Sequence, residues 1–469
     1  MSNTRRGVVI GGSLAGSLVA RVLARHVDEV VVVERDVFPD GLQDRKGVPQ
    51  GHHAHILWSG GARIIESLYP GVLDEMTQAG AHQLGVQSDL VSLTTYGWQY
   101  RFPAQQYIIG ASRALIESVL RARMEALPGV TVLSGTEVTG FLGDAEHVTG
   151  VRLAATGAGT DATREMSADI VVDAGGRGSR TPTWLTELGV PPVPEDVIDS
   201  GLVYVTRRFR PPEHLRGFPM TSLYADHLAG RPGRNGLVMP IEDGQWLVTL
   251  SGTRGDQPSA RDELFLEFAA GLRHPLIHTL LAGATPITSV RKSHSTKNRR
   301  LHFDRLERWP MGLVCVGDAV SALNPVYGHG MSSTARTARA LGHRMRRHGL
   351  GHELFDGVQA DIAAAQTDPW ALAVSQDLAY PDCRTQMADS GVFDTASRSE
   401  FADALGDAAL RDPTVSSAYT DVASLSAPVS SLQEPSVLSS LRNAQLRPHL
   451  DEPPLSAADR RMLNAKAAT

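Results

Sequence analysis

The sequence predicts an α/β fold in which a parallel sheet with helices is interleaved with an antiparallel sheet and followed by a helical region. An apolar run at residues 7–10 leads through a glycine-rich turn into a helical pattern, which is typical of a strand, a tight turn and a helix. Far downstream, a second apolar run at residues 313–316 ends on Gly317 and Asp318. Between the two, strand candidates with a hairpin signal indicate the antiparallel sheet.

Length and composition limit the classes of protein to which the chain can belong. Its 469 residues are enough for roughly two or three domains with sizeable cores. The 45 basic and 51 acidic residues give a formal net charge of -6 without a long basic run, so nucleic acid is not an expected partner. The two cysteines, Cys315 and Cys383, form neither a disulfide framework nor a CxxC pair.

No metal site and no membrane span are expected. The 17 histidines form no HExxH pattern, and the cluster at residues 52–55 has no cysteine or carboxylate at ligand spacing. No apolar run approaches the ~20 residues of a membrane span, and residues 8–10 are too short for the apolar core of a secretory signal. We therefore expect a soluble, cytoplasmic protein.

The glycine-rich turn predicts a dinucleotide-binding site. Gly11 permits the chain reversal, Gly16 lets the helix and strand pack closely, and the free amides at the helix N-terminus face a pyrophosphate. Ser13 stands where the usual GxGxxG pattern has its middle glycine, and Gly12 beside it keeps the loop tight. The expected contact residues of this turn are Gly11, Gly12, Ser13, Leu14, Ala15 and Gly16.

An acidic residue ends the second apolar run, at residues 29–33. Glu34 is placed to accept hydrogen bonds from ribose hydroxyls, and its charge would repel a 2'-phosphate. This favours FAD or NAD over NADP, and the downstream Gly317-Asp318 pair favours FAD. Arg35 belongs to the same expected site. An ordinary surface glutamate after a strand is the alternative interpretation of Glu34.

Two further segments bring basic groups to the expected site. Arg45, Lys46, Gly47 and Val48 open a basic loop that we expect to approach the flavin side of the cofactor, although a solvated loop is the alternative. A helix is predicted after residue 112, with Ser112 as its N-cap. Arg113 in the first turn of this helix either pairs with the pyrophosphate or faces solvent.

The middle of the chain supplies strands for both sheets. Residues 130–133 and 137–142 are expected to extend the first sheet and cover the adenine, with Val138 among the contacts. Residues 168–180 again combine a strand with a glycine-rich turn. From about residue 189 the strands flank longer loops, and Glu242-Asp243-Gly244 is a hairpin signal. With the candidate strand pair at residues 88–102, these strands could form a substrate domain, whose aromatic residues either line a pocket or, more commonly, pack in the core: Trp98, Tyr100, Phe102, Tyr204, Tyr224 and Trp246.

The segment after residue 317 predicts the other end of the cofactor site. Asp318 can hold the ribityl hydroxyls, while Gly328 and Gly330 let backbone amides approach the isoalloxazine at the head of a helix that begins near Met331. The positive end of that helix would stabilise negative charge on the reduced flavin. The expected contacts are Asp318, Pro325, Gly328, His329, Gly330 and Met331.

These elements together predict a Rossmann-like FAD-binding domain in three parts and an interleaved antiparallel β-sheet substrate domain. Residues 1–83, 109–188 and 303–348 are assigned to the FAD-binding domain, residues 84–108 and 189–302 to the substrate domain, and residues 349–469 to a helical C-terminal region.

The motifs resemble those of the group A flavoprotein monooxygenases, the family with the p-hydroxybenzoate hydroxylase fold. The matching motifs are residues 11–16 with Glu34, residues 169–179, and residues 317–331. The middle motif departs from the usual Asp-Gly pair and reads Asp173-Ala174-Gly175-Gly176. Within the family, the closest similarity is to the squalene-epoxidase-like enzymes of polyether biosynthesis, of the lasalocid and monensin type, on three phrases: residues 45–55, residues 324–333, and residues 368–370 with 377–378.

The resemblance implies that FAD accepts electrons from NAD(P)H, directly or through a separate flavin reductase, and reacts with O2. The resulting flavin C4a-hydroperoxide would epoxidise alkenes of a linear polyene polyketide, a small apolar substrate, in polyether antibiotic biosynthesis. The flavin carries the chemistry, so no catalytic side chain is expected.

Other activities on this fold stay open. An aromatic hydroxylase acting on a phenol and a geranylgeranyl-reductase-like enzyme that saturates alkenes would use similar motifs. A flavin halogenase is disfavoured because no two of the 6 tryptophans lie two positions apart, as its Trp-x-Trp motif requires. A binding module without FAD, similar to the escort proteins of prenylated GTPases, has no use for Glu34, Arg113 and Asp318 together.

Overall fold

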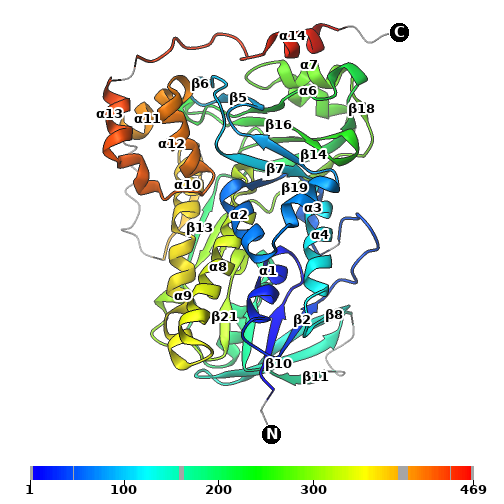
Figure 1. Cartoon of the computed structure of the whole chain (residues 1–469), viewed down its shortest axis with the longest axis vertical. Coiled ribbons are helices and arrows are strands. Elements are labelled where there is room, and N and C mark those ends of the chain that lie inside the picture. The colour runs from blue at the N-terminus through cyan, green and yellow to red at the C-terminus, as the bar shows by residue number, and fades with distance from the viewer. Residues whose placement is uncertain (1–3, 46, 158–162, 389–399, 444, 466–469) are drawn as a thin grey trace.

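A five-stranded parallel sheet forms the base of the molecule (Figure 1). The computed structural model describes residues 4–45, 47–157, 163–388, 400–443 and 445–465. The strand order is β21 (Leu313–Cys315), β12 (Ile170–Asp173), β1 (Arg6–Ile10), β2 (Glu29–Glu34) and β8 (Val130–Ser134). These strands are the predicted apolar runs, and residues such as Val8, Val31 and Val314 are almost fully buried. The predicted Rossmann-like architecture is confirmed.

Helices pack against this sheet and against one another. The first, α1 (Leu14–Leu23), connects β1 to β2 and lies between α4 (Arg113–Glu125) and α8 (Gly330–His348). The shorter helices of this part are α2 (Ser59–Leu68), α3 (Val72–Gln78) and α5 (Thr181–Glu187). Because parallel strands end at the same edge, the turns after β1, β2, β12 and β21 meet beside the N-terminus of α1.

One strand prediction is wrong. Residues 137–142 lie in β9 (Thr136–Gly143), which does not extend the parallel sheet. Gly135 has a φ of +65°, so the chain reverses immediately after β8. Strand β9 pairs instead with β10 (Val148–Ala155), which pairs with β11 (Arg164–Ser167), in a separate antiparallel sheet. Val138 is buried there against the main core, and its contact with the adenine stays a prediction.

The largest sheet has eight strands and is antiparallel except between β5 and β15. The Glu242-Gly244 hairpin is confirmed: it joins two of these strands, and Asp243 and Gly244 have φ values of 60° and 62°. Trp98 and Trp246 pack in a core with Phe265 under α6 (Phe265–Ala270) and α7 (Leu276–Ala282). The strands are β5 (Leu90–Thr94), β6 (Gly97–Trp98), β14 (Val203–Arg210), β15 (Met220–Leu223), β16 (Arg234–Ile241), β17 (Gln245–Gly252), β18 (Thr285–Pro286) and β19 (Arg291–Ser293).

Two small sheets connect the large sheet to the parallel one. Part of the predicted substrate range, β13 (Glu195–Asp199) and β20 (Asn298–Leu301), pairs with β22 (Ser321–Ala322) and β23 (Arg384–Gln386) rather than with the large sheet. The other small sheet contains β3 (His55–Trp58), β7 (Tyr107–Ala111) and β4 (His82–Gly85). The domain boundaries therefore stay predictions.

The C-terminal region is helical, as predicted. Helix α9 (His352–Ala365) packs on α8, and α10 (Thr367–Asp377) follows it (Figure 1). The remaining helices are α11 (Glu400–Arg411), α12 (Pro413–Ala423), α13 (Pro435–Asn443) and α14 (Ala457–Asn464). None of the described helices combines the length and apolar character that crossing a membrane requires.

Candidate cofactor site

The glycine-rich turn has the geometry that the sequence predicts. Gly11 has a φ of +93°, and a Cβ there would lie 2.8 Å from the carbonyl oxygen of Ala174. A Cβ on Gly16 would overlap the carbonyl oxygen of Gly11. Neither position therefore accepts a side chain without distortion. The turn after β12 consequently lies directly against the turn after β1.

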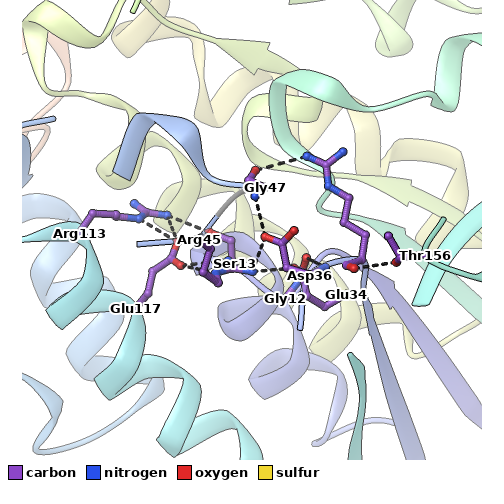
Figure 2. Close-up of polar contacts among 10 residues, drawn as sticks. Gly12, Ser13, Glu34, Asp36, Arg45, Gly47, Arg113, Glu117 and Thr156 are labelled. Atoms are coloured by element: carbon purple, nitrogen blue, oxygen red, sulfur yellow. Dashed lines mark hydrogen bonds and ion pairs between the residues drawn. The ribbon is translucent and has the colours of Figure 1, made fainter. Parts of the chain in front are cut away.

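Ser13 is the N-cap residue of α1, but its side chain makes no capping hydrogen bond. Its hydroxyl donates to the carboxylate of Glu117 and accepts a hydrogen bond of 3.0 Å from Nη2 of Arg113 (Figure 2). The first amides of α1 are thus not capped by Ser13, and the positive end of the helix dipole is directed at the same place. This is the arrangement that an anionic group such as a pyrophosphate needs.

Glu34 is a buried member of this cluster, with only 6% of the residue exposed. Its Oε2 accepts a hydrogen bond of 2.8 Å from the backbone amide of Gly12, and its Oε1 accepts one of 2.9 Å from the backbone amide of Asp36. Nη1 of Arg45 lies 3.2 Å from Oε2 in an ion pair. The alternative of an ordinary surface glutamate is therefore wrong.

Glu117 holds the two arginines together. Its Oε2 lies 3.0 Å from Nη2 of Arg45, and its Oε1 lies 2.8 Å from Nη2 of Arg113 (Figure 2). Burial opposes the ionisation of Glu117, but Arg113, Arg45 and the Ser13 hydroxyl outweigh it and lower the pKa to about 2. Sequence reasoning missed Glu117, although its position four residues after Arg113 on a helix is a recognisable signal.

The carboxylate at the end of β12 holds its own turn. Asp173 is 1% exposed and accepts hydrogen bonds from the Ser179 hydroxyl, from Thr181 Oγ1 at 2.6 Å and from the Gly175 amide at 2.8 Å. Burial raises the pKa of Asp173, and these three hydrogen bonds act in the opposite direction. The departure from the usual Asp-Gly pair thus leaves Asp173 engaged within the protein.

The Gly317-Asp318 turn follows β21 directly, and Gly317 has a φ of +59°. Burial raises the pKa of Asp318, while the charges of Arg177 and Arg113 act in the opposite direction. The Arg177 guanidinium donates a hydrogen bond of 2.6 Å to the carbonyl oxygen of Lys297 and one of 2.8 Å to the carbonyl oxygen of Leu323. Asp318 therefore lies in the field of a cation from the middle motif and of one from α4.

The second glycine-bearing turn leads into α8. Gly328 has a φ of +69°, and a Cβ there would lie 2.9 Å from Ile56. A Cβ on Gly330, the first residue of α8, would meet no atom within 4 Å. The fold itself therefore requires glycine at position 328 but not at position 330, where open space remains for a ligand.

Buried polar atoms without a partner occur at two predicted contact residues, Arg45 and His329, and at Trp58, whose ring lies beside His329. Among the described residues, Nδ1 of His329, Nε1 of Trp58 and Nη1 of Arg45 have no hydrogen-bond acceptor or donor, although Arg45 keeps its ion pair. Buried polar groups are normally paired. Together with the space at Gly330, these groups fit a planar cofactor with polar edges and a phosphate-bearing tail, as FAD has.

The structure brings most of the predicted residues into two groups. Gly12, Ser13, Glu34, Arg45 and Arg113 converge at the N-terminus of α1, while Pro325 to Met331 form the head of the neighbouring α8. Arg35 is exposed and reaches the carbonyl of Gly47 at 3.5 Å rather than the cluster. Lys46 lies outside the described residues. Within the described chain, no group of three or more His, Cys, Asp or Glu side chains is arranged to hold a metal ion.

Comparisons with known proteins agree with this geometry. The chain matches the FAD binding domain family over residues 6–352. It is 35% identical over 386 residues to Protein Rv3254 of Mycobacterium tuberculosis (strain ATCC 25618 / H37Rv), covering 80% of each chain. It is 28% identical to a kynurenine 3-monooxygenase of Salinispora arenicola (strain CNS-205), covering 73% of each.

A solved structure shares the fold. The p-nitrophenol 4-monooxygenase PnpA of Pseudomonas putida DLL-E4 superposes with a TM-score of 0.59 at 18% identity, over 80% of this chain and 89% of that one. At this identity the likeness concerns the fold alone. The chain belongs to the FAD binding domain family and has the mixed α/β fold of the FAD-dependent monooxygenases.

Proposed function

We propose that the protein is a FAD-dependent monooxygenase that epoxidises alkenes of a linear polyene polyketide in polyether antibiotic biosynthesis. The alkene, O2, NAD(P)H and a proton give the epoxide, NAD(P)+ and water, so one oxygen atom enters the product and the other is reduced. The electrons come from NAD(P)H directly or through a separate flavin reductase. Bound FAD supplies the activation of O2 and the transfer of one oxygen atom.

The residues of this chain bind and orient the cofactor. Glu34 would hold the ribose hydroxyls, Arg45 and Arg113 the pyrophosphate, and Asp318 the ribityl chain, since each offers the complementary charge or acceptor. The amides at the head of α8, at Gly330 and Met331, would face the isoalloxazine, where the helix dipole stabilises negative charge on its reduced form.

The observation that favours an alkene over a phenol is the low pKa of three histidines, which makes them weak bases. His329 is a predicted flavin contact, and His53 and His55 follow the basic loop that begins at Arg45. Burial lowers the pKa of His53 to about 3 and the pKa values of His55 and His329 to about 4. A base with so low a pKa accepts a proton poorly from a phenol, whose pKa is about 10. Epoxidation of an alkene requires no proton to be removed from the substrate.

Thr206 and Tyr204, which contact His53, are neutral side chains. Nδ1 of His53 lies 2.8 Å from Thr206 Oγ1, which lies 2.7 Å from Thr249 Oγ1, both on the large sheet. The ring of Tyr204 packs edge-on against His53 with the centroids 4.2 Å apart. Neutral hydroxyls and aromatic edges suit an apolar polyene better than an ionised phenolate.

Aromatic hydroxylation is the second candidate. It is supported by the 28% identity over 73% of the chain to a relative whose name, kynurenine 3-monooxygenase, states oxygenation of kynurenine. The two candidates differ in the product, since a phenol gains a hydroxyl group whereas an alkene gains a bridging oxygen.

Mass spectrometry with 18-O-labelled O2 separates the candidates. The protein is incubated with FAD, NAD(P)H and a flavin reductase, in parallel with a linear polyene polyketide and with a hydroxylated aromatic substrate. Labelled single-oxygen additions at isolated alkenes are expected. A labelled hydroxylated aromatic product with an unchanged polyene would establish the second candidate, and an unlabelled gain of two hydrogens would identify an alkene reductase.

A further inference from the structure

A buried carboxylate outside the predicted cofactor contacts lies next to the turn before α8. Asp377 is the last residue of α10 and is 1% exposed. It accepts hydrogen bonds of 2.6 Å from the Tyr327 hydroxyl, 2.7 Å from Nδ2 of Asn298, and 3.0 and 2.9 Å from Nδ2 of Asn324. A further hydrogen bond comes from the Ser200 side chain. Four side chains from three separate segments therefore converge on one carboxylate, because Asn324 and Tyr327 belong to the same turn.

This placement is unfavourable unless something is gained from it. A carboxylate at a helix C-terminus is opposed by the helix dipole, and its burial costs solvation free energy. Burial raises the pKa of Asp377 to about 6, against the effect of the hydrogen bonds from Tyr327, Asn324, Ser200 and Asn298. The two amide groups that contact it are donors here, so only the ionised carboxylate accepts every bond. Helix α10 also lies beyond residues 6–352, which the family match covers.

The network fixes the start of the turn that leads to Gly330. The backbone amide of Asn324 donates a hydrogen bond of 2.6 Å to Oδ1 of Asn298. Oδ1 of Asn324 accepts a hydrogen bond of 3.2 Å from the backbone amide of Val326. With Nδ2 bound to Asp377, every polar atom of the Asn324 side chain is engaged. The position of Asn324 is therefore set by Asp377 and Asn298 together.

The other end of α10 contacts the Gly317-Asp318 turn. Gln366, the N-cap residue of α10, is 1% exposed. Its Nε2 donates a hydrogen bond of 3.1 Å to the carbonyl oxygen of Gly317 and one of 3.4 Å to Oγ of Ser333. Between the two ends of α10, Trp370 and Val374 pack in one apolar cluster with Tyr327. One helix thus contacts both turns that are predicted to hold the flavin end of FAD.

We propose that Asp377 is a positioning residue for the flavin, and that α10, from Gln366 to Asp377, holds the Gly317-Asp318 turn and the Asn324–Gly330 turn in the relative placement that the isoalloxazine and ribityl groups require. The proposal rests on the proposed binding of FAD at these turns. The C-terminal region is then part of the cofactor site rather than only a cover over it.

The test compares Asp377→Asn with Asp368→Asn, the same substitution in the first turn of the same helix, where Asp368 lies 3.6 Å from Arg336 in a partly exposed ion pair. FAD dissociation constants are measured by fluorescence titration, two-electron midpoint potentials by reductive titration, and unfolding temperatures by circular dichroism. Tyr327→Phe, which removes a single hydroxyl, is the milder second variant.

Asp377→Asn is expected to weaken FAD binding about tenfold, because a charge-assisted hydrogen bond network is lost. The affinity for reduced FAD should fall about tenfold further than the affinity for oxidised FAD, since displaced amides stabilise the negative charge of reduced flavin less. That difference corresponds to a midpoint potential lower by about 30 mV for two electrons. Tyr327→Phe should shift both quantities in the same direction and be non-additive with Asp377→Asn, while Asp368→Asn should match the wild type.

A role in folding alone predicts a different result. If Asp377→Asn only lowers the unfolding temperature and keeps the wild-type dissociation constant and potential, the proposal is wrong while FAD binding stands. If the wild-type protein binds no FAD, the proposed function and this inference both fail. Should Asp377→Asn not fold, wild-type FAD affinity and potential in Tyr327→Phe would overturn the proposal.

Discussion

At the scale of single residues, Glu117 contributes to the pH dependence of stability. Its pKa is about 2 in the folded protein against an ordinary value of 4.5, so its ionisation stabilises the fold above pH 4.5 and this contribution is lost as the pH falls through 2. The difference corresponds to roughly 3 kcal/mol in the free energy of unfolding. Glu117→Gln should therefore flatten the pH dependence of unfolding in this window, as measured by chemical denaturation of the FAD-free protein.

The matched control for this experiment is Glu125→Gln, at the exposed end of the same helix. It should keep the wild-type slope. Parallel pH profiles for Glu117→Gln and the wild type would mean that the ion pairs with Arg45 and Arg113 contribute nothing to folding.

Glu34 is expected to act on cofactor affinity. Replacing it with Ala should weaken FAD binding by roughly 1 to 3 kcal/mol, because a buried charge-assisted hydrogen bond to the ribose is lost. Isothermal titration with FAD measures the change, and Glu29→Ala at the other end of the same strand is the control, since Glu29 pairs with Arg6 at 2.8 Å on a partly exposed surface. An unchanged dissociation constant for Glu34→Ala would exclude it from the site.

At the scale of elements, the head of α8 distinguishes a glycine needed for folding from one needed for the ligand. Gly330→Ala adds a methyl group into open space at a helical position, so the unfolding temperature should be unchanged or slightly higher. FAD affinity should fall, because the methyl group occupies space intended for the isoalloxazine. Gly328→Ala, with its positive φ, should instead destabilise the fold. Wild-type FAD affinity in Gly330→Ala would contradict this assignment.

The elements that the sequence predicts well are those with a local signal. Strands β1, β2, β8 and β21 are apolar runs, and their parallel order follows from the helices and turns between them. The segment of β9 is also a strand candidate, but its partner is decided by the turn at Gly135, which periodicity does not resolve. The contact of α10 with Asn298 and Asn324 has no local signal, because these residues are distant in the sequence.

At the scale of the whole molecule, the sequence predicts the turns and charged residues at the two ends of the candidate cofactor site. It does not predict the contacts that join them. The glycine turns, Glu34, Arg45 and Arg113 follow from the chemistry of pyrophosphate and ribose recognition. The ion pair of Glu117 with Arg45 requires the loop after β2 to lie against α4, and the low pKa values of His53 and His329 require their burial. Both depend on tertiary structure, which a linear motif does not specify.

The turn after β1 and the turns after β21, which are far apart in the sequence, are expected to form one FAD site. Fluorescence titration of the purified protein with FAD, repeated with Asp318→Ala, tests this expectation most directly. We expect one FAD per wild-type chain. The Asp318→Ala protein should keep its circular dichroism spectrum but not retain FAD, since the ribityl hydroxyls lose their acceptor. A wild-type protein that takes up no FAD, or an Asp318→Ala variant that stays fully yellow, would contradict it.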